Sequence, residues 1–270
     1  MQKKLLVLDI DGTLTNSKKE ITKKTKQKLF DIQKMGHIVM LASGRPTPGM
    51  IRYAKELKLA EYGGYLLSYN GARIVDCRTG QVIYQRTLPG ETIPKLYKFA
   101  KKHHCGIISY ENDTVLSGNG LDEYIKLEAR INGIPIREID NFADYITFPV
   151  NKCLMTAEPK DAEVYVGMLQ KEFGDTLSIY RSEPFFIEIM PYNIDKAASL
   201  DRTLPHLNLT RKNTICCGDG YNDISMIQYA NIGVAMKNAR EEVQAVADFI
   251  TDSNDEDGLV RVIDTFILNS

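Results

Sequence analysis

Hydrophobic residues along the chain gather in short continuous runs that alternate with amphipathic segments. Leu5–Leu8, Ile38–Ala42 and Tyr65–Ser68 are almost entirely apolar, as expected of strands that are buried on both faces of a sheet. Between these runs, Lys23–Lys34 and Pro48–Leu57 have the mixed apolar and polar spacing of helices that cover a sheet. The alternation of strand and helix predicts a parallel sheet with helices on both of its faces.

The middle of the chain has a different pattern. Paired short runs at Gly106–Tyr110 and Thr114–Ser117 predict a hairpin, and they are mixed with helical segments, which is typical of an antiparallel α+β unit. The buried-strand pattern returns at Thr214–Cys217. The other predicted helices are Ile93–His104, Leu121–Asn132, Ala162–Phe173, Lys196–Leu204, Ile224–Tyr229 and Glu241–Ala247, and the other predicted strands are Ala72–Val75, Cys153–Ala157, Leu177–Arg181, Phe185–Met190, Ile232–Ala235 and Phe249–Thr251.

These patterns predict a two-domain α/β protein. Residues 1–84 and 189–270 form a Rossmann-like parallel-sheet core, and residues 85–188 form an inserted α+β domain. The length of 270 residues suits one large or two modest domains.

Composition narrows the possible function. The formal net charge of −1 gives no overall attraction to nucleic acid, and no apolar run approaches the ~20 residues that span a bilayer. The five cysteines show no C-x-x-C spacing, so we expect neither a disulfide framework nor a zinc site, and a reducing cytoplasm is the expected location.

Chemistry-bearing residues follow the predicted strands. In an open parallel sheet the loops at the carboxyl ends of the strands share one crevice. The residues predicted to lie at this edge are Asp9 and Asp11, Ser43-Gly44-Arg45, Asn70-Gly71 and Gly218-Asp219-Gly220-Tyr221-Asn222-Asp223. Lys196 lies at the predicted start of a helix.

This set of residues predicts phosphoryl transfer assisted by a metal ion. Crowded carboxylates repel one another unless a cation compensates them, and Mg²⁺ prefers oxygen ligands. A lysine, a hydroxyl group and glycine N–H groups suit a phosphate. Asp9 and Asp11 point to the same side of an extended chain, so one carboxylate can attack phosphorus while the other handles a proton.

The motifs resemble those of the haloacid dehalogenase-like (HAD) phosphatases. Asp9-Ile10-Asp11-Gly12-Thr13 is similar to the first motif of the family, Ser43 to the second, Lys196 to the third and Gly218-Asp219-x-x-Asn222-Asp223 to the fourth. An insertion after Asn70-Gly71 resembles the C2 cap of the Cof-type branch, subclass IIB.

The resemblance implies a role for each matching residue. It makes Asp9 the nucleophile and a Mg²⁺ ligand, and Asp11 the acid/base, which binds the metal through its backbone carbonyl group. It further implies that Asp219 ligates Mg²⁺ and that Asp223 supports the metal shell. The implied phosphate-binding residues are Ser43, Lys196, Asn222 and the backbone N–H groups of Ile10 and Gly44.

We therefore expect a Mg²⁺-dependent phosphomonoesterase that hydrolyses small phosphorylated metabolites, with sugar phosphates favoured, through an aspartyl-phosphate on Asp9. Arg45, Ser182 and Glu188 are candidate substrate contacts. Two alternatives stay open: a phosphosugar mutase of the phosphomannomutase type that uses the same nucleophile, and a non-catalytic phosphometabolite-binding regulator. We expect no nucleic-acid or membrane partner, and the oligomeric state is not predicted.

Two other motifs are weaker. The segment from Asp9 could start an EF-hand, but Leu14 stands where that loop needs glycine, and a strand precedes it. The lysines from Lys18 to Lys28 lack interleaved aromatic residues, so we interpret them as the solvated face of a helix and not as a nucleic-acid site.

Overall fold

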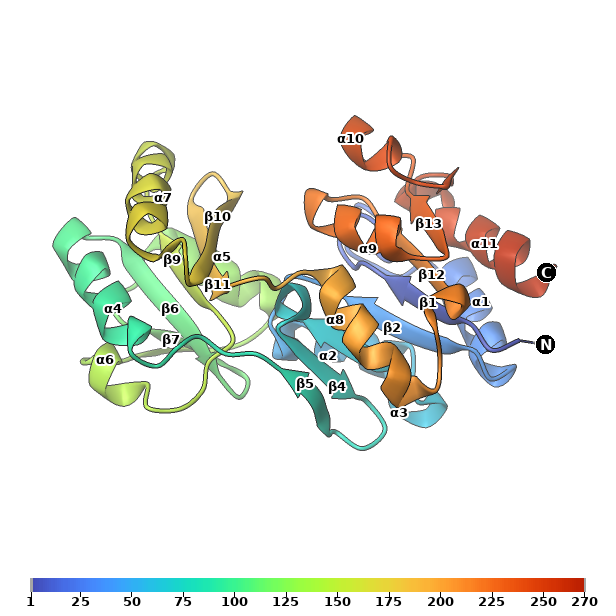
Figure 1. Ribbon diagram of the computed structural model, residues 1–270, viewed down its shortest axis with the longest axis horizontal. Coiled ribbons are helices and arrows are strands. Elements are labelled where there is room, and N and C mark those ends of the chain that lie inside the picture. The colour runs from blue at the N-terminus through green and yellow to red at the C-terminus, as the bar shows by residue number, and fades with distance from the viewer. Residues whose placement is uncertain (1, 270) are drawn as a thin grey trace. The chain divides into compact units, whose positions relative to one another are not determined.

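The computed structural model describes residues 2–269, and their contacts divide the chain into two compact units (Figure 1). The first unit contains Met1–Tyr84 and Asp195–Ser270, and the second contains Gln85–Ile194. The return to the first unit comes at Asp195 where the sequence pattern placed it at 189, because strand β11 (Phe186–Pro191) extends beyond that position.

The first unit is built on an eight-stranded sheet with the order β14-β13-β12-β1-β2-β3-β4-β5. Its strands are β1 (Leu5–Leu8), β2 (Ile38–Ala42), β3 (Tyr65–Ser68), β4 (Arg73–Asp76), β5 (Val82–Gln85), β12 (Thr214–Gly218), β13 (Ile232–Ala235) and β14 (Phe249–Ile250). Neighbours from β14 to β3 pair in parallel, and β4 turns back antiparallel to β3. The expected parallel-sheet core is confirmed.

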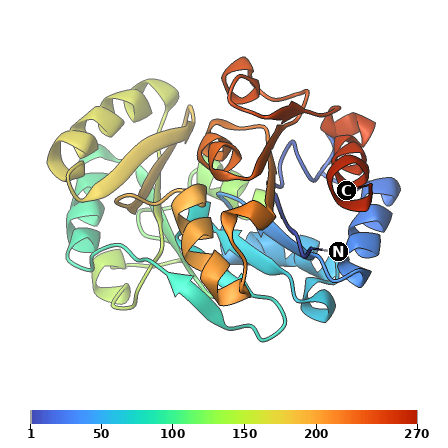
Figure 2. The same ribbon diagram turned by 45° about the vertical axis from the view of Figure 1, so that its right-hand side comes forward.

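Helices cover both faces of this sheet, as Figures 1 and 2 show. One hydrophobic layer joins the strands to α1 (Lys23–Lys34), α2 (Thr47–Glu56), α3 (Leu59–Tyr62) and α11 (Gly258–Ile263). The opposite layer joins them to α8 (Lys196–Thr203) and α9 (Ile224–Tyr229), and α10 (Glu241–Gln244) packs beside β13. Strands β1 and β2 are apolar and buried at every position, as expected of strands that are covered on both faces.

The second unit has a six-stranded sheet with the order β10-β11-β9-β6-β7-β8. Besides β11, its elements are strands β6 (Gly106–Glu111), β7 (Thr114–Ser117), β8 (Ile136–Glu138), β9 (Cys153–Thr156) and β10 (Leu177–Glu183), and helices α4 (Thr92–His103), α5 (Glu123–Asn132), α6 (Phe142–Tyr145) and α7 (Pro159–Phe173). All of its pairings are antiparallel except β7 with β8. This is the expected α+β unit.

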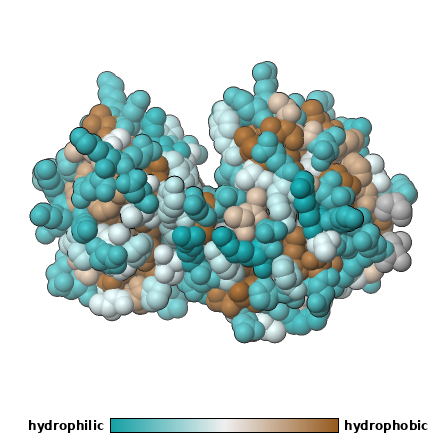
Figure 3. Space-filling view, in the orientation of Figure 1, coloured by the Kyte–Doolittle hydropathy of each residue, from teal (hydrophilic) through white to brown (hydrophobic). Residues whose placement is uncertain are grey.

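On the face in Figure 3, hydrophobic residues form small groups among hydrophilic ones on each unit. Within residues 2–269, no helix has the length and apolar character needed to cross a membrane.

Candidate active site

The register of three parallel strands brings the candidate residues of the first unit to the same end of the sheet. Leu8 of β1 pairs with Cys217 on one side and with Leu41 on the other. The next residue, Asp9, donates its backbone N–H to the Cys217 carbonyl oxygen at 3.0 Å. The loops that follow β1, β2 and β12 therefore begin side by side at the carboxyl edge of the sheet.

Lys196 joins these loops from the first position of α8. Asp195 caps the helix by accepting the N–H of Ala198 at 2.9 Å, and the Lys196 side chain is fully buried. Its Nζ lies 2.8 Å from Asp9 Oδ1, 2.6 Å from Asp223 Oδ1 and 2.8 Å from the Ala42 carbonyl oxygen. These three bonds use all the donors of the ammonium group. The two carboxylates outweigh burial and raise the pKa of Lys196, so it is a fixed cation.

Asp223 and Asp219 are oriented by short-range hydrogen bonds. Asp223 Oδ2 accepts the backbone N–H groups of Asp219 at 3.0 Å and Gly220 at 2.9 Å, which closes the loop after β12. The buried Thr13 hydroxyl group donates to Asp219 Oδ1 at 2.8 Å. Gly12, with φ +89°, passes so near that a Cβ there would lie 2.3 Å from Asp219 Oδ2. Only glycine permits this approach.

The carboxylates of Asp9, Asp219 and Asp223 form a compact acidic cluster. One oxygen from each lies within 4.8 Å of the others. Burial, followed by the charge of Asp223, raises the pKa of Asp9 well above its ordinary value. Burial also raises the pKa of Asp219 from 3.8 to about 6. Three carboxylates against the single ammonium group of Lys196 leave uncompensated negative charge, and the oxygen-only donor set fits a hard divalent cation such as Mg²⁺.

Asp11 points into a different environment. Arg45 donates to both of its oxygens, from Nε at 2.6 Å and from Nη2 at 2.8 Å, and Lys19 Nζ lies 2.9 Å from Oδ1. Burial raises the pKa of Asp11, but Arg45 and Lys19 outweigh it and hold the pKa at about 2. In this arrangement the Asp11 carboxylate is an anion, and its side chain stands apart from the acidic cluster.

The candidate phosphate-binding residues lie on the loops of the same edge. Ser43 is buried, and its hydroxyl oxygen accepts the backbone N–H of Arg45 at 3.2 Å. Asn222 is exposed and donates its amide to Asn70 Oδ1 at 3.0 Å. The Ile10 side chain is fully buried in the core beside Asp9. The structure thus places Ser43 and Asn222 on two loops of the first unit, and Lys196 at the start of α8 in the same unit.

The sequence of the chain matches a known family across both units. A family model described as haloacid dehalogenase-like hydrolase matches residues 6–263. The chain belongs to the haloacid dehalogenase-like hydrolase family. The first and fourth motifs expected from the sequence fall on the loops after β1 and β12 of this HAD fold.

Relatives of this HAD protein agree with that assignment. A haloacid dehalogenase-like hydrolase from Bacteroides thetaiotaomicron has a solved structure with a TM-score of 0.94 and 44% identity, covering 97% of this chain and 99% of that one. The structure of BT4131, titled a HAD subclass IIB sugar phosphatase, has a TM-score of 0.82 and 26% identity over 98% and 99% of the two chains. The Bacillus subtilis 5-amino-6-(5-phospho-D-ribitylamino)uracil phosphatase YcsE is 28% identical, covering 98% and 96%. The identification of this protein as a HAD-type phosphatase, expected from its motifs, is confirmed.

Ser182 and Glu188 lie in the second unit of this HAD protein. The Ser182 hydroxyl group donates to Glu188 Oε1 at 2.9 Å. Glu188 Oε2 lies 3.0 Å from Nζ of the buried Lys152, so the charge of Glu188 is already compensated within the unit. The sequence did not single out Lys152.

Two further residues that contact the site were not assigned to it from sequence. Lys19 was expected on the solvated face of a helix, but α1 begins only at Lys23, and Lys19 has a left-handed backbone (φ 62°) that brings it to Asp11. Thr13 carried a signal, as part of the Asp-x-Asp-Gly-Thr string.

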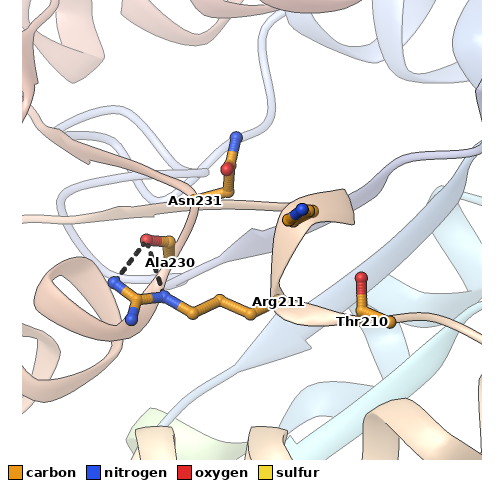
Figure 4. Close-up of a pocket in the computed structure, with 5 residues that line it drawn as sticks. Thr210, Arg211, Ala230 and Asn231 are labelled. Atoms are coloured by element: carbon orange, nitrogen blue, oxygen red, sulfur yellow. Dashed lines mark hydrogen bonds between the residues drawn. The ribbon is translucent and has the colours of Figure 1, made fainter.

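A pocket at the opposite edge of the HAD core is unrelated to these motifs. Figure 4 shows its lining residues: Thr210, Arg211, Lys212, Ala230 and Asn231. They precede β12 and β13 and so lie at the amino ends of these strands. The Arg211 guanidinium donates to the Ala230 carbonyl oxygen at 3.3 and 3.4 Å, which ties the two loops together.

Proposed function

We propose that this protein is a Mg²⁺-dependent phosphomonoesterase that transfers a phosphoryl group first to Asp9 and then to water. The observation that carries the proposal is the placement of the Asp9 carboxylate, 2.8 Å from the buried Lys196 ammonium group and within the acidic cluster. A carboxylate needs no base to act as a nucleophile at neutral pH.

The proposed reaction has two displacements. A carboxylate oxygen of Asp9 attacks phosphorus, the bond from phosphorus to the ester oxygen breaks, and Asp11 gives a proton to the departing oxygen. Water then attacks the aspartyl-phosphate, Asp11 takes a proton from that water, and inorganic phosphate leaves with Asp9 regenerated. Since Arg45 and Lys19 hold Asp11 as an anion in this structure, the Asp11 carboxylate must first leave these partners and take up a proton from solvent, which it then gives to the departing oxygen.

Asp9 and Asp219 would hold Mg²⁺ through their carboxylates and Asp11 through its backbone carbonyl group, with Asp223 behind them as the residue that orients the loop. When bound, the cation offsets the negative charge of the carboxylates and the phosphate.

Ser43, Lys196 and Asn222, together with the backbone N–H groups of Ile10 and Gly44, would hold the phosphate. The buried ammonium group of Lys196 supplies the positive charge. To bind phosphate it would exchange one of its three present acceptors for a phosphate oxygen.

The substrate class that we propose is small phosphorylated metabolites, with sugar phosphates favoured. The names of YcsE and BT4131 support this choice, because the first is called a 5-amino-6-(5-phospho-D-ribitylamino)uracil phosphatase and the second a sugar phosphatase. We further propose that the second unit selects the leaving group, with Ser182 and Glu188 among its contacts and Arg45 as a contact from the first unit. Glu188→Gln keeps the shape of the side chain and should change the ranking of substrates in a panel of sugar phosphates. An unchanged ranking would remove Glu188 from the proposal.

The test of the whole proposal compares the wild type with Asp9→Asn. With Mg²⁺, the wild type should release phosphate from phosphomonoesters, and Asp9→Asn should lose this activity. Equal rates would end the proposal. With a hexose 1-phosphate as substrate, free hexose supports hydrolysis, whereas hexose 6-phosphate would show a mutase. Tight binding without turnover would show a regulator.

A further inference from the structure

Three consecutive residues at the end of β3 have left-handed backbone conformations. They are Tyr69 (φ 52°), Asn70 (φ 51°) and Gly71 (φ 106°). This conformation is costly for a bulky residue such as Tyr69 and persists only where the surroundings impose it. Here the N–H of Tyr69 donates to the Arg45 carbonyl oxygen at 2.9 Å, and the N–H of Asn70 donates to that of Ser43 at 3.0 Å. The turn is therefore joined to the loop that carries Ser43.

The Asn70 side chain extends this connection to a second loop. Its Oδ1 accepts the amide N–H of Asn222 at 3.0 Å. The Asn70 amide also lies close to Gly44, since a Cβ at Gly44 would lie 3.2 Å from both Oδ1 and Nδ2 of Asn70. The Asn70 amide thus stands between Gly44 and Asn222, two of the groups that the proposed function assigns to phosphate.

We propose that Asn70 is a positioning residue of the phosphate site, an inference that rests on the proposed function. By joining the Ser43–Gly44 loop to the exposed Asn222 side chain, the Asn70 amide fixes the separation of phosphate-binding groups that come from two different strands. Without this amide, Asn222 loses its hydrogen-bond partner and samples more rotamers, and ordering it again on binding costs affinity.

A simpler role for Asn70 is that of a turn residue, because asparagine tolerates the left-handed region. The two roles are separable. Asn70→Gly keeps the left-handed turn and removes the amide. If Asn70 served only as a turn residue, this replacement would leave phosphate affinity unchanged. Asn208 supplies a matched control, since it has φ 53° and lies in the loop after Leu204–Leu207, before β12 begins at the opposite edge of the sheet.

The experiment measures the Kd of inorganic phosphate by calorimetry with saturating Mg²⁺, together with kcat, KM and the melting temperature. We expect Asn70→Gly to raise the phosphate Kd and KM about tenfold, with a smaller change in kcat and a melting temperature like that of Asn208→Gly. Asn208→Gly should bind phosphate as the wild type does. The double variant Asn70→Gly/Asn222→Ala should lose less than the two single losses combined, because both remove the same link.

Wild-type phosphate affinity in Asn70→Gly would overturn the inference and leave the proposed function standing, as would additive losses in the double variant. A wild-type protein that neither binds phosphate nor hydrolyses phosphomonoesters would overturn the proposed function, and the inference with it.

Discussion

The guanidinium group of Arg45 binds both carboxylate oxygens of Asp11, at 2.6 and 2.8 Å, from the loop that follows the neighbouring strand. Arg45 is buried, whereas Asp11 keeps a third of its side chain exposed. A bidentate salt bridge of this kind fixes the orientation of the Asp11 carboxylate and compensates its charge. The residue proposed to move protons is therefore held in a resting orientation, which it leaves when it exchanges Arg45 and Lys19 for the leaving group.

The first prediction concerns the pH dependence of this pair. Arg45 and Lys19 hold the pKa of Asp11 at about 2, below its ordinary 3.8, so the folded state favours the ionised form. The pair should contribute stability above pH 4 and lose it as the pH falls towards 2. Arg45→Met should lower the free energy of unfolding by about 1–2 kcal/mol at pH 7, a value reduced for the partial exposure of Asp11. Urea unfolding from pH 7 to 3 would show this difference shrinking.

Lys19→Met is the control for that series. More than half of the Lys19 side chain is exposed, so its removal should change the free energy of unfolding by less than about 0.5 kcal/mol. A difference between wild type and Arg45→Met that does not depend on pH would contradict the assigned cause.

The second prediction concerns the buried cation of the site. Lys196→Met leaves Asp9 and Asp223 buried without their ammonium partner, so the metal-free protein should lose about 3–5 kcal/mol of stability. Mg²⁺ should recover part of this loss by supplying positive charge to the same carboxylates. Denaturant unfolding with and without Mg²⁺ measures both effects. A variant as stable as the wild type without metal would show that Lys196 does not compensate these acids.

The third prediction concerns the metal-free protein as a function of pH. Burial raises the pKa of Asp219 from 3.8 to about 6, so the folded state binds a proton that the unfolded state has already lost. Stability should therefore rise as the pH falls from about 7 to 4, by at most about 3 kcal/mol from this group. Asp9 has the same sign.

Mg²⁺ should reverse this trend, because a bound cation favours the ionised carboxylates. The increase in melting temperature produced by Mg²⁺ should be larger at pH 7.5 than at pH 5. The reference is the melting temperature of a chelator-treated sample in Ca²⁺-free buffer. An equal increase in melting temperature at pH 7.5 and at pH 5 would mean that the acidic cluster does not bind the metal.

The fourth prediction concerns Thr13, whose hydroxyl group orients Asp219. Thr13→Val keeps the shape of the side chain and removes the hydrogen bond, so the Kd of Mg²⁺ should rise about tenfold. Thr13→Ser keeps the hydroxyl group and should stay near wild type. Calorimetric titration of the metal-free variants compares the two. Equal affinities for valine and serine would remove Thr13 from the support of the metal site.

The sheet was predictable because its strands are buried on both faces and hence apolar along their whole length, as in β1 and β2. The sequence missed α3, α6, α11, β5 and β8. All except α11 are three or four residues long, too short to establish a period, and tertiary packing decides their conformation.

The loops after β1 and β12 were predictable as neighbours, since parallel strands bring their carboxyl ends to one edge. The link between Lys19 and Asp11 was not, because it depends on a left-handed residue in a loop of otherwise ordinary composition. Asn70-Gly71 was recognised as a turn, but the partner of the Asn70 amide lies 152 positions further along the chain and has no local signal.

The pairing of β1 with β12 has a consequence for how this protein is made. Leu5 and Thr214 are register partners on adjacent strands of the sheet, yet a ribosome releases them more than 200 residues apart. Until the later strand emerges, β1 keeps one open edge, which is prone to wrong pairing. This edge therefore stays open through the synthesis of the whole second unit, and the acidic cluster of Asp9, Asp219 and Asp223 is completed only near the end of translation.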